Sequence, residues 1–122
     1  MPAPRKTPCR ISQITTHILD TTKGKPAANV TIALLQQAGD NWQEIARGIT
    51  NSDGRIADLL PKENVLELGV YKMKFFTQEY FAQNDTANFY PFVEIVFNVA
   101  GNEHYHVPLL LNPFGYATYR GS

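Results

Sequence analysis

The feature of the sequence that most constrains its fold is an alternation of side-chain character with a period of two. It is clearest along residues 14–19 and 69–76, where every second residue falls on the same face of an extended chain. Further short strands are predicted at 30–35, 42–49, 92–99, 104–111 and 114–120. Residues 92–99 are rich in β-branched and aromatic side chains, and 42–49 mix Glu, Arg and Gln with apolar residues, as expected of a half-exposed strand. About seven or eight short strands at this spacing predict an antiparallel β-sandwich.

The predicted strands are separated by residues that favour tight turns. Residues 51–54 read Asn-Ser-Asp-Gly, and Asp-Gly favours the left-handed backbone torsions of such turns. Residues 23–26 and 100–102 are two further predicted turns. Thr77 is expected to cap a short helix that runs through Gln83, because Thr followed closely by Glu or Gln is a helix start signal.

The length of 122 residues fits one domain, which we place at residues 13–122. Residues 1–12 carry three positive charges and no negative ones, at Arg5, Lys6 and Arg10. We expect these first residues to form a basic, mobile arm. Apolar residues make up 43% of the chain, which argues against intrinsic disorder of the domain.

Charge and cysteine content exclude several classes of function. Eleven basic and eleven acidic side chains give no net charge, so no basic field is available for nucleic acid. Cys9 is the single cysteine, which excludes an internal disulfide framework and a cysteine-based zinc cluster. No apolar run approaches the roughly 18 residues of a membrane span, so no membrane partner is expected. Without a signal-like segment we expect a cytoplasmic location, or a periplasmic one if an export signal was removed.

The last predicted strand has two possible roles. Residues 115–119 carry no charge, and an uncharged strand at the edge of a sheet can recruit another chain. The same residues can instead pair internally with the strand that contains residues 109–111. The two roles are compatible.

Three histidines are the candidates for chemistry. His104 and His106 lie two apart, so on a strand both project from one face while Tyr105 points the other way. Two such imidazoles, with His17 as a third ligand, could bind zinc. A histidine taken alone is more often a structural group, and the residue pattern by itself does not decide between these interpretations.

Several motifs taken together resemble those of one family. Residues 15–20 (Thr-Thr-His-Ile-Leu-Asp) and 24–27 (Gly-Lys-Pro-Ala) are similar to the opening signature of the transthyretin-like 5-hydroxyisourate hydrolases. Residues 51–55 match their Asp-Gly-Arg segment, and 104–111 resemble their second signature. The chain closes with Tyr-Arg-Gly-Ser at 119–122, similar to their C-terminal tetrapeptide.

This resemblance implies a fold, an assembly and a set of site residues. The fold is a transthyretin-like sandwich of two four-stranded sheets with one short helix after the fifth strand. The assembly is a homotetramer, a dimer of dimers with active sites in a central channel. The matching site residues are His17, Arg55 and His106 as catalytic groups, and Tyr119, Arg120 and Ser122 as substrate-binding groups. His104 is expected beside the site or exposed, and Asn112 departs from the family's usual serine.

The implied reaction is the hydrolytic opening of 5-hydroxyisourate, the product of urate oxidation, to an imidazoline carboxylate. Histidine suits the activation of water because its ordinary pKa is about 6.5, and arginine suits the stabilisation of an oxyanion. On this hypothesis His106 activates water, His17 shares the proton network and Arg55 polarises the substrate carbonyls. Which histidine is base and which is acid stays open. The reaction needs no cofactor and no metal, and none is expected.

A binding module is the rival class of function. The resemblance extends to transthyretin itself, a hormone carrier that uses the same fold without catalysis. That carrier lacks the residues matched here at His17, Arg55 and His106, and it lacks the tetrapeptide. The presence of all of them in this sequence favours the enzyme.

Overall fold

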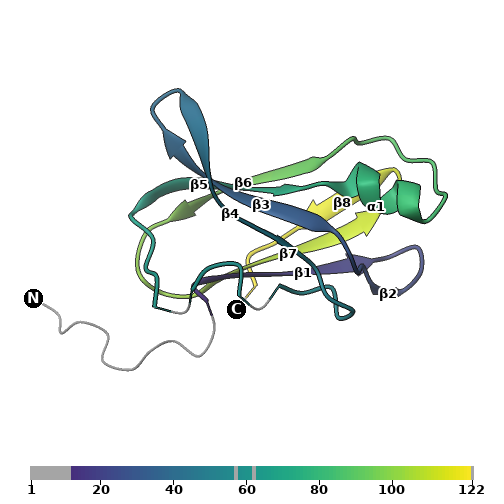
Figure 1. Cartoon of the computed structure of the whole chain (residues 1–122), viewed down its shortest axis with the longest axis horizontal. Helices are drawn as coiled ribbons and strands as arrows, with labels where there is room; N and C mark the ends of the chain where they lie inside the picture. Colours follow the sequence, from purple (N-terminus) through teal and green to yellow (C-terminus); the bar gives the residue numbers. More distant parts are fainter. Residues whose placement is uncertain (1–11, 57, 62, 122) are drawn as a thin grey trace, which may run out of the picture.

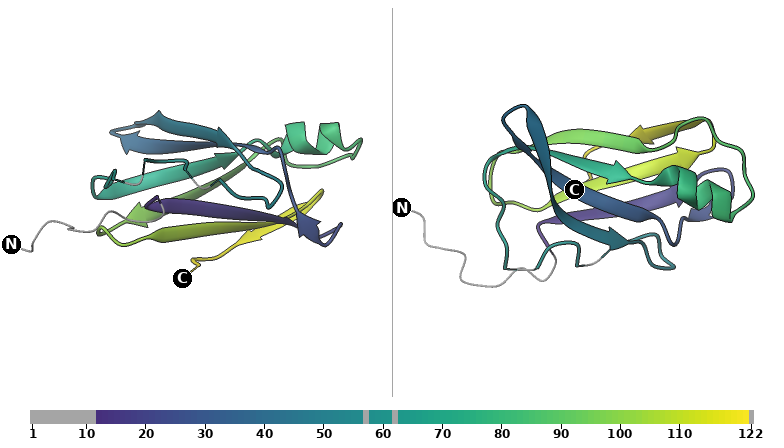
Figure 2. Two further views of the ribbon diagram at one scale, coloured as in Figure 1. Left: turned by 60° about the horizontal axis from the view of Figure 1, so that its bottom comes forward. Right: turned by 45° about the horizontal axis from the view of Figure 1, so that its top comes forward.

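A computed structural model describes residues 12–56, 58–61 and 63–121. Within these residues the elements follow in the order β1 (Ile14–Asp20), β2 (Lys25–Pro26), β3 (Thr31–Ala38), β4 (Asn41–Ile49), β5 (Gly69–Phe75), α1 (Thr77–Gln83), β6 (Val93–Val99), β7 (Tyr105–Asn112) and β8 (Gly115–Thr118). The strands form two four-stranded sheets, β2-β1-β7-β8 and β4-β3-β5-β6. The sheets lie as two layers with α1 at one end (Figures 1 and 2). The predicted β-sandwich with one short helix is confirmed.

The core fills the space between the two sheets. Along β1 the residues Ile14, Thr16 and Ile18 are buried, while those between them are half-buried. β5 shows the same alternation, with Tyr71 and Phe75 among its buried side chains. The period of two in the sequence therefore marks which side of each strand faces the other sheet.

The connections differ from the simplest reading of the sequence at two places. Residues 25–26 belong to the predicted turn at 23–26, yet they form the short strand β2 and pair with the end of β1. The turn at 100–102 leads from β6 to β7, which belong to different sheets. β7 then pairs with β1 in parallel, the one parallel pair among the described strands. These pairings are set by contacts across the whole chain, which local turn propensity does not encode.

The helix lies where it was predicted, but its predicted cap is wrong. α1 spans Thr77–Gln83, whereas the N-cap residue is Phe76 and makes no capping side-chain bond. The N–H of Phe76 donates to the Thr31 carbonyl at 2.9 Å, so strand pairing with β3 continues to the residue before the helix. Thr77 is consequently the first helical residue, fully buried, and its Oγ1 has no hydrogen-bond partner among the described residues.

The last strand pairs internally, as one of the two interpretations predicted. β8 is antiparallel to β7, with Leu109 opposite Thr118 and Leu111 opposite Tyr116. β8 nevertheless remains the outer strand of its sheet. The described part of the chain contains no helix long and apolar enough to cross a membrane.

Candidate functional site

The candidate site lies on the outer face of the sheet β2-β1-β7-β8. Because Thr16 and Ile18 are buried toward the other sheet, Thr15 and His17 project from the opposite, outer face of β1. In the parallel register Thr15 lies opposite His106 on β7, one residue beyond Tyr105, which is buried on the inner side. Two histidines from distant parts of the sequence therefore share one face of the sheet.

The turn at residues 51–54 brings Arg55 to the same place. The N–H of Ile18 donates to the Gly54 carbonyl at 2.9 Å, and His17 and Arg55 form an antiparallel bridge. Gly54 has φ +72°, and a Cβ there would lie 2.5 Å from the carbonyl oxygen of Ile18. Only glycine fits this close approach of two backbones. The Asp-Gly-Arg sequence thus fixes Arg55 next to His17, and the predicted turn is confirmed.

The end of the chain closes the other side of the site. Gly121 forms an antiparallel bridge with His106, and its N–H donates to the His106 carbonyl at 2.9 Å. Across the face, the backbone order is therefore Arg55, His17 on β1, His106 on β7, and Gly121. Four segments of the sequence contribute to one continuous surface.

Thr15 joins the two neighbouring histidines. Its Oγ1 lies 2.7 Å from Nε2 of His104 and 2.8 Å from Nδ1 of His106. The two imidazole rings are stacked, with centroids 6.4 Å apart and planes 27° from parallel. Both rings are half-buried. Of the two expectations for His104, the structure therefore places it beside His106 and does not leave it fully exposed.

All three histidines favour the neutral form. Burial lowers the pKa of His106, and the positive charge of Arg55 lowers it further, followed by His104 and His17. Burial and Arg55 also lower the pKa of His17, against an opposing hydrogen bond with the Asp53 backbone. The pKa of His104 is lowered by burial. Neutral imidazoles near neutral pH can accept a proton, which is the requirement for a general base.

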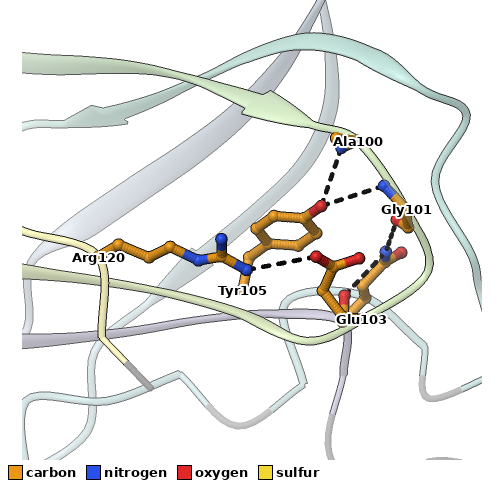
Figure 3. Close-up of polar contacts among 6 residues, drawn as sticks. Ala100, Gly101, Glu103, Tyr105 and Arg120 are labelled. Carbon is orange, nitrogen blue, oxygen red and sulfur yellow. Dashed lines mark hydrogen bonds and ion pairs between the residues drawn. The ribbon is translucent and has the colours of Figure 1, made fainter.

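Arg120 lies against the turn before β7 and not among the histidine rings. Its guanidinium lies over the Tyr105 ring, 4.7 Å from the centroid, and pairs with Glu103 at 3.5 Å (Figure 3). The Tyr105 hydroxyl in turn accepts the N–H groups of Ala100 and Gly101 at 2.8 and 3.1 Å. These contacts anchor the C-terminal segment to the crossing between the sheets.

A cavity of about 350 Å³ opens beneath that segment, at the edge between the sheets. Its lining consists of Ile95, Phe97, Asn98, Tyr105, His106, Val107, Thr118, Tyr119 and Arg120. Tyr105 and Val107 belong to the inner face of β7, whereas the ring of His106 belongs to the outer face. The cavity therefore adjoins the histidine face through His106 and does not contain it.

The structure brings together three of the six predicted site residues, His17, Arg55 and His106. Tyr119 is exposed at the rim of the cavity with Arg120, and Ser122 lies outside the described residues. No group of three or more His, Cys, Asp or Glu side chains that could hold a metal is found in the described ranges.

Thr15 is a residue of this histidine face that the sequence did not single out. A signal for it exists, because the alternation along β1 places Thr15 on the same face as His17. What the sequence could not supply is the parallel pairing of β1 with β7, which sets Thr15 beside His106.

The fold and the histidine face define a transthyretin-like β-sandwich, and comparison with known proteins agrees. The model of the HIUase/Transthyretin family matches residues 14–121. The chain belongs to this family. It is an enzyme, a hydrolase, as its curated relatives are.

Three relatives illustrate the similarity. The 5-hydroxyisourate hydrolase of Halalkalibacterium halodurans is 44% identical over 116 residues, which cover 90% of this chain and 98% of the relative. The structure of Klebsiella pneumoniae 5-hydroxyisourate hydrolase has a TM-score of 0.81 and 34% identity, covering 91% of this chain and all of that one (100%). Sea bream transthyretin in complex with thyroxine has a TM-score of 0.83 and 34% identity, covering 89% of this chain and 94% of that one.

Proposed function

We propose that this protein hydrolyses 5-hydroxyisourate to an imidazoline carboxylate in the degradation of urate. The observation that carries the proposal is the placement of His17, Arg55 and His106 on one sheet face, in a chain related to named 5-hydroxyisourate hydrolases. In this reaction water adds to a ring carbonyl, a ring C–N bond breaks, and the departing nitrogen takes up a proton. The chemistry needs a base, an acid and a stabiliser of negative charge.

In our scheme His106 removes the proton from the attacking water. The support is its lowered pKa, which keeps the imidazole neutral and able to accept a proton. His17 exchanges protons with the same site and supplies one to the departing nitrogen. The lowered pKa of His17 suits it to release a proton after it has taken one up.

Arg55 polarises the carbonyl under attack. Its guanidinium stays charged and presents a planar fork of donors to oxygen, and its exposure leaves those donors open to a ligand. Tyr119, Arg120 and Ser122 orient the ring of the substrate in this scheme. Tyr119 and Arg120 are supported by lining, together with His106, the cavity that adjoins the histidine face, and Ser122 by the sequence resemblance alone.

The working form in this proposal is a homotetramer, a dimer of dimers. β6 and β8 are outer strands of their sheets, and unpaired strand edges recruit partners. Large apolar side chains at or near these edges are exposed, namely Phe89, Val96, Phe114, Tyr116 and Tyr119. Sedimentation equilibrium should give four times the 13.7 kDa mass of the chain, and a monomer at micromolar concentration would contradict the assembly.

An absorbance assay tests the activity. Urate oxidase generates 5-hydroxyisourate in the cuvette, and the protein should accelerate the decay of that intermediate in proportion to its concentration. A carrier without catalysis is the competing outcome, since the sea bream relative binds thyroxine. Unchanged decay together with saturable binding of thyroxine would favour the carrier and overturn the proposed activity.

A further inference from the structure

A single hydroxyl group is shared by two histidines of the site. Thr15 Oγ1 lies within hydrogen-bond distance of His104 Nε2, at 2.7 Å, and of His106 Nδ1, at 2.8 Å. A threonine hydroxyl carries one hydrogen and two lone pairs, so it can donate at most one of these two bonds and must accept the other one, or both. At least one of the two imidazoles must therefore carry a hydrogen on the nitrogen that faces Thr15.

Two arrangements of the neutral rings use the Thr15 hydrogen in one of the two bonds, and in a third both rings donate to Thr15 while its hydroxyl hydrogen points elsewhere. In the first, Nδ1–H of His106 donates to Thr15, and the Thr15 hydroxyl donates to Nε2 of His104, whose own hydrogen is then on Nδ1. In the second, Nε2–H of His104 donates to Thr15, which donates to Nδ1 of His106, whose hydrogen is then on Nε2. In each of the first two arrangements both rings carry their hydrogen on the same kind of nitrogen, whereas the third combines Nδ1–H of His106 with Nε2–H of His104.

The first two arrangements differ in what His106 can do. Its Nδ1 is bound to Thr15, so Nε2 is the nitrogen through which it can exchange a proton with water or substrate. The first arrangement leaves a lone pair on Nε2, as a general base needs. When Nε2 takes up a proton, Nδ1–H remains bonded to Thr15, so nothing has to rearrange. The second arrangement already has hydrogen on Nε2 and provides no basic nitrogen there.

We propose that Thr15 is a positioning residue that holds His104 and His106 in their Nδ1–H tautomers and so keeps Nε2 of His106 available as the base. The proposal rests on the proposed function, in which His106 activates water. His104 has a defined part in it: its Nε2 accepts the Thr15 hydroxyl and thereby directs the oxygen of Thr15 to receive the hydrogen from His106.

Nuclear magnetic resonance of the histidine rings tests the proposal without using activity. Two-bond ¹H–¹⁵N correlation spectra of protein labelled with ¹⁵N-histidine, recorded above the pKa values of the rings, distinguish Nδ1–H from Nε2–H tautomers. We expect the Nδ1–H pattern for both His104 and His106 in the unmodified protein. In Thr15→Val the pattern should change at both rings, and in Thr15→Ser it should be retained. Nε2–H at His106 in the unmodified protein, or different tautomers in the two rings, would overturn the proposal.

Thr16→Val is the matched control, because it removes a hydroxyl from the next residue of the same strand. That hydroxyl donates to the Val107 carbonyl at 2.6 Å on the inner side and touches neither histidine. The Thr16→Val substitution should therefore leave the tautomers of both His104 and His106 unchanged. A tautomer change in Thr16→Val as large as in Thr15→Val would mean that general loosening of β1 is responsible, and this too would overturn the proposal.

Kinetics provide the second test. Thr15→Val should lower kcat by about 10–100-fold with a smaller change in KM, a loss typical of a misdirected catalytic group, and Thr15→Ser should restore most of it. Active unmodified protein together with an unchanged kcat in Thr15→Val overturns the role of Thr15. If the unmodified protein shows Nδ1–H tautomers at both rings but does not hydrolyse 5-hydroxyisourate, the proposed function is overturned. The role of Thr15 in catalysis is then overturned with it.

Discussion

Gly121 lies so close to His106 that no side chain fits between them. Its N–H donates to the His106 carbonyl at 2.9 Å, and a Cβ built on Gly121 would lie 2.5 Å from Cδ2 and 3.2 Å from Cβ of that histidine. Contacts extend along the whole side chain, so the ring cannot avoid the added atom by a small rotation. The end of the chain therefore confines the position of the proposed base.

The first prediction concerns this contact. Gly121→Ala should displace either the His106 ring or the C-terminal segment and lower kcat by about 100-fold, since a misplacement of about 1 Å can cost that much. Gly115→Ala is the matched control, because a Cβ there meets only ordinary contacts, at 3.6 Å or more. Steady-state kinetics on both variants, with circular dichroism to verify the fold, make the comparison. Equal kcat values for Gly121→Ala and Gly115→Ala would show that the contact does not position the base.

The second prediction concerns pH. Burial, and then the charge of Arg55, lowers the pKa of His106 from its ordinary 6.5, and the same two causes act on His17. Because the neutral imidazole is the active base, kcat/KM should fall on the acidic side with an apparent pKa below 6.5. Arg55→Gln removes a positive charge that disfavours the imidazolium form. The acidic limb of the kcat/KM–pH profile should therefore move to higher pH, and the maximum value of kcat/KM should fall. A limb that stays in place or moves to lower pH in Arg55→Gln would contradict this electrostatic account.

The third prediction concerns stability away from the site. The Tyr80 hydroxyl on α1 donates to Oδ2 of the buried Asp20 at 2.6 Å. Burial, and then Asp20, raises the pKa of Tyr80, so the phenol stays protonated and remains a donor. Tyr80→Phe leaves the Asp20 carboxylate one donor short and should lower the free energy of unfolding by about 1–3 kcal/mol, with little change in kcat.

Urea denaturation measures this loss. Tyr90→Phe is a suitable control, since Tyr90 is 37% exposed and water can replace any bond its hydroxyl makes. We expect its unfolding midpoint to match that of the unmodified protein. If Tyr80→Phe also unfolds at the unmodified midpoint, the bond between α1 and β1 contributes nothing to stability.

The fourth prediction concerns metal. Zinc is the alternative means of activating water, and the protein should keep full activity after exhaustive chelation. Recovery of a lost activity only when zinc is added back would replace histidine-activated water with metal catalysis.

Local pattern predicted much of the fold, because alternation reports directly on which face of a strand is buried. It placed Thr15 and His17 on one face of β1 and Asp53-Gly54 in a turn, as observed. It failed where long-range pairing decides. The pairing of Phe76 with Thr31 takes the helix cap away from Thr77, and the parallel register of β1 with β7 creates the bond between Thr15 and His106. In each of these two pairs, the partners lie far apart in the sequence.

The most direct test of the account is the kcat/KM of His106→Ala in the coupled assay with urate oxidase, measured beside the unmodified protein. The account predicts clear hydrolysis of 5-hydroxyisourate by the unmodified protein and a loss of about 100–10,000-fold in the variant, the range expected for removal of a general base. The variant should keep the circular dichroism spectrum and the sedimentation behaviour of the unmodified protein. A folded His106→Ala protein that turns over substrate at the unmodified rate would contradict the assignment of the histidine face as the active site.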